Sequence, residues 1–254
     1  RENAWLEDIE IQDSAYPYHD WNERITEESY SPNSAARILS NNQRIIDIVN
    51  NYSKISFNFG PTLLSWMEKN APEVYEAILE ADKESRKLFS GHGAAIAQVY
   101  NHMIMPLANK RDKRTQVYWG IRDFQHRFGR DPEGMWLPET AVDLETLEVL
   151  VEYGIDYTIL SPYQASKVRE TGKKEWRAAD GGKVDPKKPY KCVLPSGKSI
   201  NLFFYDGPIA QDISFGDLLG NGENFAKRLY GAFAKPSKSN DNQLVHIATD
   251  GETY

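Results

Sequence analysis

The chain has 254 residues, of which 40% are hydrophobic and 26% are charged, and its formal net charge is −7. The length suffices for one large α/β domain or two small ones, and the composition is ordinary for a globular protein. The sequence contains no run of about 18 apolar residues, so no transmembrane helix is predicted. An acidic chain without a basic stripe argues against nucleic acid as a partner.

In the first third of the chain, residues 1–33 are predicted to form an ordered loop. A helix is predicted to begin at Pro32, with Ile38, Ile45 and Val49 on one face. A strand over 54–59 follows and ends at Gly60-Pro61. The next helix is predicted to begin near Pro72 and to bury the face that carries its apolar residues, Val74, Ile78 and Ala81.

The middle of the chain alternates between helix and strand signals. Gly91-His92-Gly93 is a break, and residues 94–100 fit either a strand or a helix. A helix over 111–128 ends at Gly129, a strand covers 134–139, a helix from Asp143 to Tyr153 has Asp143 as its N-cap, and a strand covers 156–160. This alternation is typical of parallel βα units.

The last third begins with a lysine-rich stretch over 171–190, which is predicted to be a surface insertion. A basic patch for an anionic partner is the alternative interpretation. Strands over 191–194 and 199–205 are predicted to form a hairpin around Pro195-Ser196-Gly197-Lys198. A helix near 222–234 precedes a final strand over 244–252. Cys192 is the only cysteine, which excludes an internal disulfide framework and is consistent with a cytoplasmic protein.

Two predicted strands end on a carboxylate, at Glu139 and at Asp250. In α/β barrels the catalytic side chains lie at the C-terminal ends of the strands. Cleavage of a glycosidic bond needs two carboxyl groups with different roles, so the pair suggests this chemistry. The alternatives stay open: Glu139 could cap the next helix, and Asp250-Gly251-Glu252 could form a turn or a cation site.

Other residues could support such a site. His246 lies four residues before Asp250 and thus on the same strand face, and His92 lies between glycines that let a ligand approach the backbone closely. Asp206 ends another strand, although a turn explains it as well. Trp136 faces away from Glu139 unless the strand kinks at Pro138. The histidine spacings match no known metal-ligand motif, so no metal is predicted.

The segments Trp136-Leu137-Pro138-Glu139-Thr140-Ala141-Val142-Asp143 and His246-Ile247-Ala248-Thr249-Asp250-Gly251-Glu252-Thr253-Tyr254 resemble those of glycoside hydrolase family 57. The resemblance extends over nearly the whole chain. It implies an incomplete (β/α)7 barrel of mostly parallel strands and a retaining mechanism on α-glucans without a cofactor. By the same resemblance Glu139 is the nucleophile and Asp250 the general acid/base, and we assign substrate binding to His92, Trp136, Asp206, His246 and Glu252.

The sequence departs from the family pattern at both ends. The family's histidine-rich first strand is expected just before Arg1, and the family continues beyond Asp250. The expectation is therefore one partial barrel domain over 1–254, truncated at both ends.

The leading hypothesis is a retaining glycosidase or transglycosidase that binds an α-glucan or oligosaccharide and associates with no membrane. The rival hypotheses are a metal-dependent polysaccharide deacetylase and a non-catalytic sugar-binding domain. Which glucan is bound, whether water or sugar is the acceptor, and the oligomeric state stay open.

Overall fold

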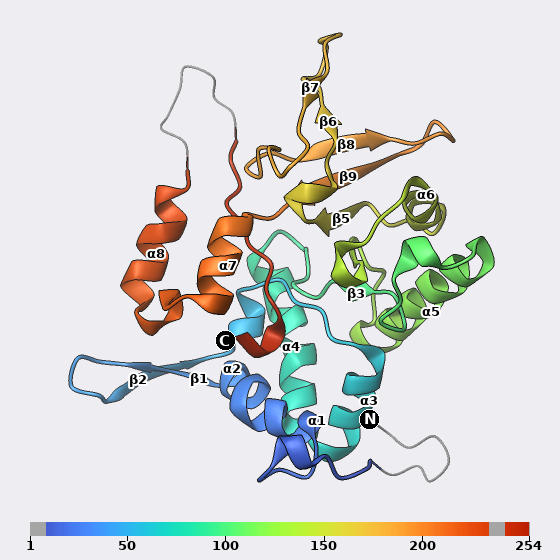
Figure 1. The fold of residues 1–254 in the computed structure, drawn as a ribbon. Coiled ribbons are helices and arrows are strands. Elements are labelled where there is room, and N and C mark those ends of the chain that lie inside the picture. The colour runs from blue at the N-terminus through green and yellow to red at the C-terminus, as the bar shows by residue number, and fades with distance from the viewer. Residues whose placement is uncertain (1–8, 234–241, 254) are drawn as a thin grey trace. The chain divides into compact units, whose positions relative to one another are not determined.

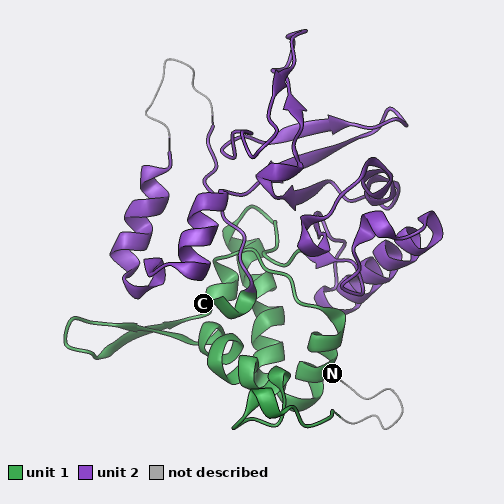
Figure 2. Cartoon of the chain, viewed as in Figure 1, with its two compact units in different colours: residues 1–96, 251–254 green, residues 97–250 purple. Residues whose placement is uncertain are grey.

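The computed structural model describes residues 9–233 and 242–253, which Figure 1 traces as a ribbon. The chain divides into two compact units: residues 1–96 with 251–254, and residues 97–250 (Figure 2).

The first unit is mainly helical. Its elements are η1 (Asp13–Ala15), α1 (Trp21–Ile25), η2 (Thr26–Tyr30), α2 (Ser31–Ser34), β1 (Ala36–Leu39), β2 (Ile45–Val49), η3 (Asn51–Ser53), α3 (Pro61–Asn70), α4 (Pro72–Leu88) and η8 (Gly251–Thr253). The predicted loop over 1–33 is wrong for residues 21–33, which lie in short helices. Asp20 begins them as an N-cap, because its carboxylate accepts hydrogen bonds from the backbone of Asn22 and Glu23.

The predicted helix that carries Ile38, Ile45 and Val49 is also wrong, because β1 and β2 form an antiparallel hairpin. Apolar residues at these positions fit a helical period, but the intervening turn contains Gln43 with a φ of 58°, which no regular helix accommodates. The β-branched isoleucines favour extended backbone instead.

Helix α4 buries its predicted face, which confirms that prediction: Val74, Ile78 and Ala81 are all buried. Helix α3 was not predicted, because Pro61 was interpreted as the end of a strand and not as a helix start. The predicted strand over 54–59 is reduced to an isolated parallel bridge between Phe57 and Ala95.

The second unit contains both helices and short sheets. Its elements are β3 (Ala97–Gln98), η4 (Met105–Leu107), α5 (Lys110–Phe128), β4 (Met135–Trp136), η5 (Pro138–Thr140), α6 (Leu144–Glu152), β5 (Tyr157–Leu160), η6 (Pro162–Gln164), β6 (Lys167–Val168), β7 (Arg177–Ala178), β8 (Tyr190–Val193), β9 (Ser199–Phe204), α7 (Gly207–Phe215), η7 (Leu218–Gly220) and α8 (Gly222–Gly231). The predicted α/β class is confirmed in its coarse form: the chain mixes helices with small sheets.

Parallel pairing follows the order of the chain in this unit. Strand β3 pairs with β4, Gly134 forms a parallel bridge with Tyr157 at the start of β5, and β5 pairs with β9. Strands β8 and β9 form the predicted antiparallel hairpin. Strands β6 and β7 form a second antiparallel pair.

Helix α5 packs closely on β3. A Cβ atom built on Gly120 would overlap the backbone oxygen of Gln98, so only glycine fits at this position. The helix ends at Gly129, which adopts the left-handed conformation and confirms the predicted stop. Asp143 caps α6, as predicted.

Three predictions in this unit are corrected. The strand predicted over 134–139 is reduced to the bridge at Gly134 and the two-residue strand β4, because the backbone turns at Pro138. Asp206-Gly207-Pro208 begins helix α7, where Asp206 is the N-cap and the proline fits the first turn. Residues 242–250 have no regular secondary structure, since Leu244 and His246 hydrogen-bond to different segments and no described strand pairs along them.

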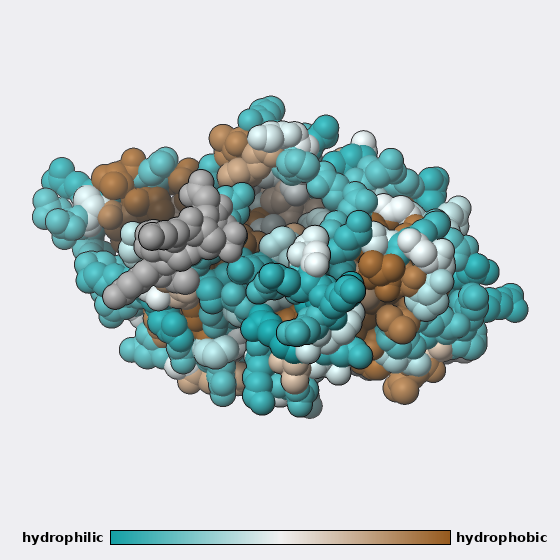
Figure 3. Space-filling model, turned by 90° about the horizontal axis from the view of Figure 1, so that it is seen from above, coloured by the Kyte–Doolittle hydropathy of each residue, from teal (hydrophilic) through white to brown (hydrophobic). Residues whose placement is uncertain are grey.

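None of the helices in the described parts of the chain is long and apolar enough to cross a membrane. The face shown in Figure 3 is mostly hydrophilic, with hydrophobic patches separated from one another.

Candidate functional site

Glu139 lies in a strained turn directly after β4. Its φ is 55° and that of Thr140 is 51°, a left-handed conformation that costs an L-residue roughly 1–2 kcal/mol. The side chain of Glu139 is 69% exposed, so burial of this side chain cannot be the reason for the strain. Residues held in such conformations are concentrated at functional sites, where the surrounding structure maintains them.

Buried neighbours hold this turn in place. Met135 and Leu137 are fully buried, and the hydroxyl of Thr158 on β5 donates a hydrogen bond to the backbone oxygen of Met135 at 2.8 Å. Thr140 is buried as well. The turn therefore projects the Glu139 side chain outward from a packed base.

His102 is the partner of Glu139. Its Nε2 atom lies 3.0 Å from Oε1 of Glu139. The sequence interpretation did not assign His102 to the site. The missed signal is positional: His102 follows β3 and Glu139 follows β4, and these strands are parallel neighbours with Gln98 opposite Trp136. Residues that follow adjacent parallel strands reach the same edge of a sheet.

The far end of the Glu139 turn is fixed by a buried lysine. Lys113 on α5 is 1% exposed, and its Nζ atom lies 2.7 Å from Asp143 and 3.0 Å from Glu145. The other carboxylate oxygen of Asp143 caps α6 by accepting from the backbone and hydroxyl of Thr146. One carboxylate thus links α5 to the first turn of α6, four residues after Glu139.

The charges in this network stabilise one another. Burial raises the pKa of Asp143, but hydrogen bonds from Lys113 and Thr146 outweigh it, and the net pKa is lowered. For Lys113, burial lowers the pKa, while hydrogen bonds to Asp143 and Glu145 outweigh it and raise the net pKa. Both groups are therefore ionised over a wide pH range around neutrality.

Asp206 and His246 lie together in the second unit. The backbone N–H of Asp206 donates to the backbone oxygen of His246 at 2.9 Å, while its side chain caps α7 through Ile209. The Nε2 atom of His246 is buried and has no hydrogen-bond partner among the described residues. Burial lowers the pKa of His246 despite the backbone of Phe204 and the charge of Asp206, so the ring is neutral near pH 7.

The other predicted site residues are more dispersed. Trp136 is half-buried in β4, and the kink that its access to the site requires is present at Pro138–Thr140. Asp250 is exposed at the end of the irregular segment 242–250, and its side chain forms no hydrogen bond or ion pair with a residue that the structure describes. His92 and Glu252 belong to the first unit, where both are exposed, His92 in the turn after α4 and Glu252 in η8.

Within residues 9–233 and 242–253, no group of three or more His, Cys, Asp or Glu side chains is arranged to hold a metal ion. His102 can hold the carboxylate of Glu139 in one orientation, in which it stays exposed to a ligand.

Comparison with known proteins gives a consistent result. The model of the family described as glycosyl hydrolase family 57 matches residues 9–254. A 4-alpha-glucanotransferase of Thermococcus litoralis is 25% identical over 165 residues, which are 64% of this chain and 23% of that protein. Alpha-amylase 1 of Dictyoglomus thermophilum is 29% identical over 107 residues, which are 42% of this chain and 15% of that protein.

Solved structures show the same fold. The exo-type maltose-forming amylase of Pyrococcus sp. ST04 superposes with a TM-score of 0.66 at 18% identity, over 93% of this chain and 35% of that one. The T. litoralis glucanotransferase superposes with a TM-score of 0.63 at 19% identity, over 91% of this chain and 30% of that one. The matched regions thus cover between 15% and 35% of the lengths of these three proteins.

Proposed function

The chain belongs to glycosyl hydrolase family 57, and from that premise we propose that the whole protein is a retaining glycoside hydrolase or transglycosidase acting on α-glucans. The names of its relatives, an amylase and a glucanotransferase, support this substrate class. The observation that carries the proposal is the Glu139 carboxylate, which is exposed on a strained turn after a strand and hydrogen-bonded to His102.

In the proposed mechanism Glu139 is the nucleophile. Its carboxylate attacks the anomeric carbon while the glycosidic C–O bond breaks, and the Asp250 carboxyl group gives its proton to the departing oxygen. Asp250 then takes a proton from water or from an acceptor sugar, whose oxygen displaces Glu139 from the anomeric carbon. This mechanism needs the two carboxyl groups about 5–5.5 Å apart.

We assign His102 to the orientation of the nucleophile. An ionised carboxylate has only acceptors, so Nε2 of His102 carries the proton and donates it in the hydrogen bond to Glu139. This contact limits the rotation of the Glu139 side chain. The carboxylate oxygen that does not bond to His102 therefore stays directed away from the imidazole. Pre-orientation of this kind lowers the entropic cost of attack.

Sugar contacts are proposed for Trp136, Asp206 and His246, and also for His92 and Glu252. His246 has the best support among them. Its buried Nε2 atom has no partner among the described residues, and leaving such an atom unpaired costs about 1–3 kcal/mol. A sugar hydroxyl is a group that could satisfy it.

The finer fold proposal is a partial (β/α)7 barrel with a surface insertion over 171–190. Successive parallel pairings from β3 to β4, from residue 134 to residue 157, and from β5 to β9 support it. Helix α5 connects β3 to β4 and helix α6 connects β4 to β5, as crossover connections between parallel strands usually do. The cytoplasm stays the proposed compartment, on the basis of the single cysteine.

The decisive experiment replaces Glu139 in the whole protein. Glu139→Gln removes the nucleophile but retains the shape of the side chain, so turnover of α-glucans should fall by more than about a thousandfold, or roughly 4 kcal/mol in the barrier. The melting temperature should stay unchanged, because the side chain is exposed. The control is Glu175→Gln, another exposed glutamate, which should keep full activity. Undiminished turnover in the Glu139 variant would overturn the assignment.

A further inference from the structure

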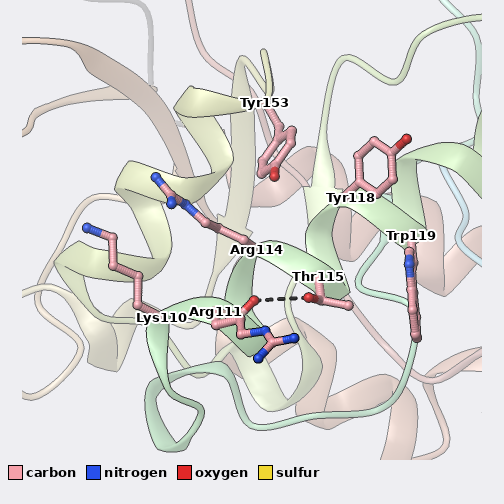
Figure 4. Close-up of a pocket in the computed structure, with 7 residues that line it drawn as sticks. All are labelled: Lys110, Arg111, Arg114, Thr115, Tyr118, Trp119 and Tyr153. Atoms are coloured by element: carbon pink, nitrogen blue, oxygen red, sulfur yellow. Dashed lines mark hydrogen bonds between the residues drawn. The ribbon is translucent and has the colours of Figure 1, made fainter.

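A second cluster of polar and aromatic side chains lies on α5, apart from the Glu139 turn. It lines an open pocket of about 470 Å³ within the second unit (Figure 4). Six of the seven lining residues come from α5 between 110 and 119, and the seventh, Tyr153, follows α6. The proposed glycosidase mechanism uses none of these residues.

Three cations line the pocket in a chain whose net charge is −7. Arg114 is held by Glu152, with its Nη2 atom 2.8 Å from the carboxylate. Lys110 and Arg111 are exposed, and neither forms an ion pair with a residue that the structure describes. The charge of Lys110 acts on the carboxylate of Glu148, so the Arg111 guanidinium is the charge that remains available to an anionic ligand.

The pocket also carries three aromatic rings. Trp119 is 48% exposed, and its ring packs edge to face with Tyr100 at a centroid distance of 5.6 Å. Tyr118 packs against Tyr153 at 6.0 Å. These contacts fix the rings while leaving part of each surface open. Figure 4 shows Lys110 at one end of the pocket and the rings of Tyr118 and Trp119 at the other, with Arg111, Arg114 and Tyr153 between them.

The two halves of the pocket select different parts of one ligand. Guanidinium and ammonium groups bind phosphate oxygens through charge-assisted hydrogen bonds. Aromatic faces pack against the apolar face of a ring, since their large surface gains most from such burial. A neutral sugar would leave the Arg111 guanidinium without an anion, and a free phosphate would leave the rings without a partner.

We propose that this pocket binds a phosphorylated sugar, with the phosphate on Arg111 and the sugar ring against Trp119. The site goes beyond the proposed function, because binding there requires neither Glu139 nor turnover of a glucan.

Isothermal titration calorimetry of the whole chain with glucose 6-phosphate tests the proposal. We expect saturable binding to one site, weakening as salt is raised, because the cations are exposed and screened. Arg111→Gln should weaken binding about tenfold, the effect of losing one charge-assisted hydrogen bond. Trp119→Ala should weaken it by a similar factor. The matched controls Arg122→Gln and Trp176→Ala, both outside the pocket, should bind as the parent does.

Further arms separate this ligand from its alternatives. Inorganic phosphate and the neutral maltoheptaose should each bind at least tenfold more weakly than glucose 6-phosphate. Equal binding of either one, or the absence of saturable binding, would overturn the proposal. The Glu139→Gln variant should bind glucose 6-phosphate normally even if Glu139 proves not to be the nucleophile. Loss of binding in that variant would place the ligand at the Glu139 turn and contradict a site on α5.

Discussion

At the scale of single residues, the conformation of Glu139 separates function from stability. Glu139 and Thr140 are consecutive L-residues with positive φ, and a β-branched residue such as Thr140 is especially unfavourable there. The exposed carboxylate of Glu139 contributes little burial in return. The site therefore holds a residue that stability alone does not require, which is consistent with a role in chemistry.

This strain predicts an unusual order of stability. Glu139→Gly should be more stable than Glu139→Ala by up to about 1 kcal/mol, because glycine avoids the left-handed penalty. The greater entropy of glycine in the unfolded chain offsets part of this gain. Urea unfolding of both variants measures the difference.

The same pair of substitutions at Glu76, which is exposed on helix α4, is the control. There alanine should be the more stable residue, by about 1 kcal/mol. If alanine is also preferred at position 139, the turn is not strained in solution.

At the scale of elements, the base of the site depends on contacts between helices and strands that lie far apart in sequence. Lys113 on α5 binds the N-cap of α6, and Gly120 on α5 lets the helix contact β3. One helix thereby fixes both the strand that precedes His102 and the segment that follows Glu139. Substitutions at either contact should lower the stability of the fold more than they alter the chemistry of the site.

The Asp143 network predicts how stability changes in acid. The folded-state pKa of Asp143 lies below its ordinary value of 3.8, so the ionised group stabilises the fold above that pH. This contribution is lost as the pH falls through the lower folded-state pKa. The stability of Asp143→Asn should therefore be lower near neutrality and should decline less than that of the parent below pH 4.

Chemical denaturation at a series of pH values measures this effect. Asp217→Asn changes an exposed aspartate in the same way and serves as the control, with a pH profile like that of the parent. Parallel profiles for the parent and Asp143→Asn would show that the Lys113 contact is absent in solution.

The packing of α5 on β3 gives a prediction about Gly120. Gly120→Ala places a methyl group against the backbone of Gln98, so it should destabilise the protein by about 1–3 kcal/mol, as overpacking does. Thermal unfolding measures the loss. Gly231→Ala, with no atom within 4 Å of the new methyl group, should cause no loss. Equal stability of the two variants would contradict this helix position.

At the scale of the whole molecule, the proposed reaction distinguishes the leading hypothesis from the metal-dependent rival. The family model covers residues 9–254, and the reaction proposed for the whole protein uses two carboxyl groups. Glucan turnover by the whole protein should therefore persist after incubation with EDTA. A reducing-sugar assay measures it. Activity that EDTA abolishes and a divalent cation restores would instead favour the metal-dependent rival.

The sequence by itself determined the elements whose signals are local. Helices α4, α5 and α6 were predicted from apolar periodicity and from their first or last residues, and the β8–β9 hairpin from its turn. The family was identified from motifs around Glu139 and Asp250. Each of these features depends on residues within a few positions of one another, where period and conformational preference act directly.

Only the tertiary structure decided the rest. The exposed hairpin β1–β2 shares its apolar spacing with a helix, and α7 begins at residues that also suit a turn, so local preference was ambiguous in both cases. The contact between His102 and Glu139 arises because β3 and β4 are parallel neighbours. Pairing of this kind depends on how distant segments pack, and no local pattern near either residue specifies it.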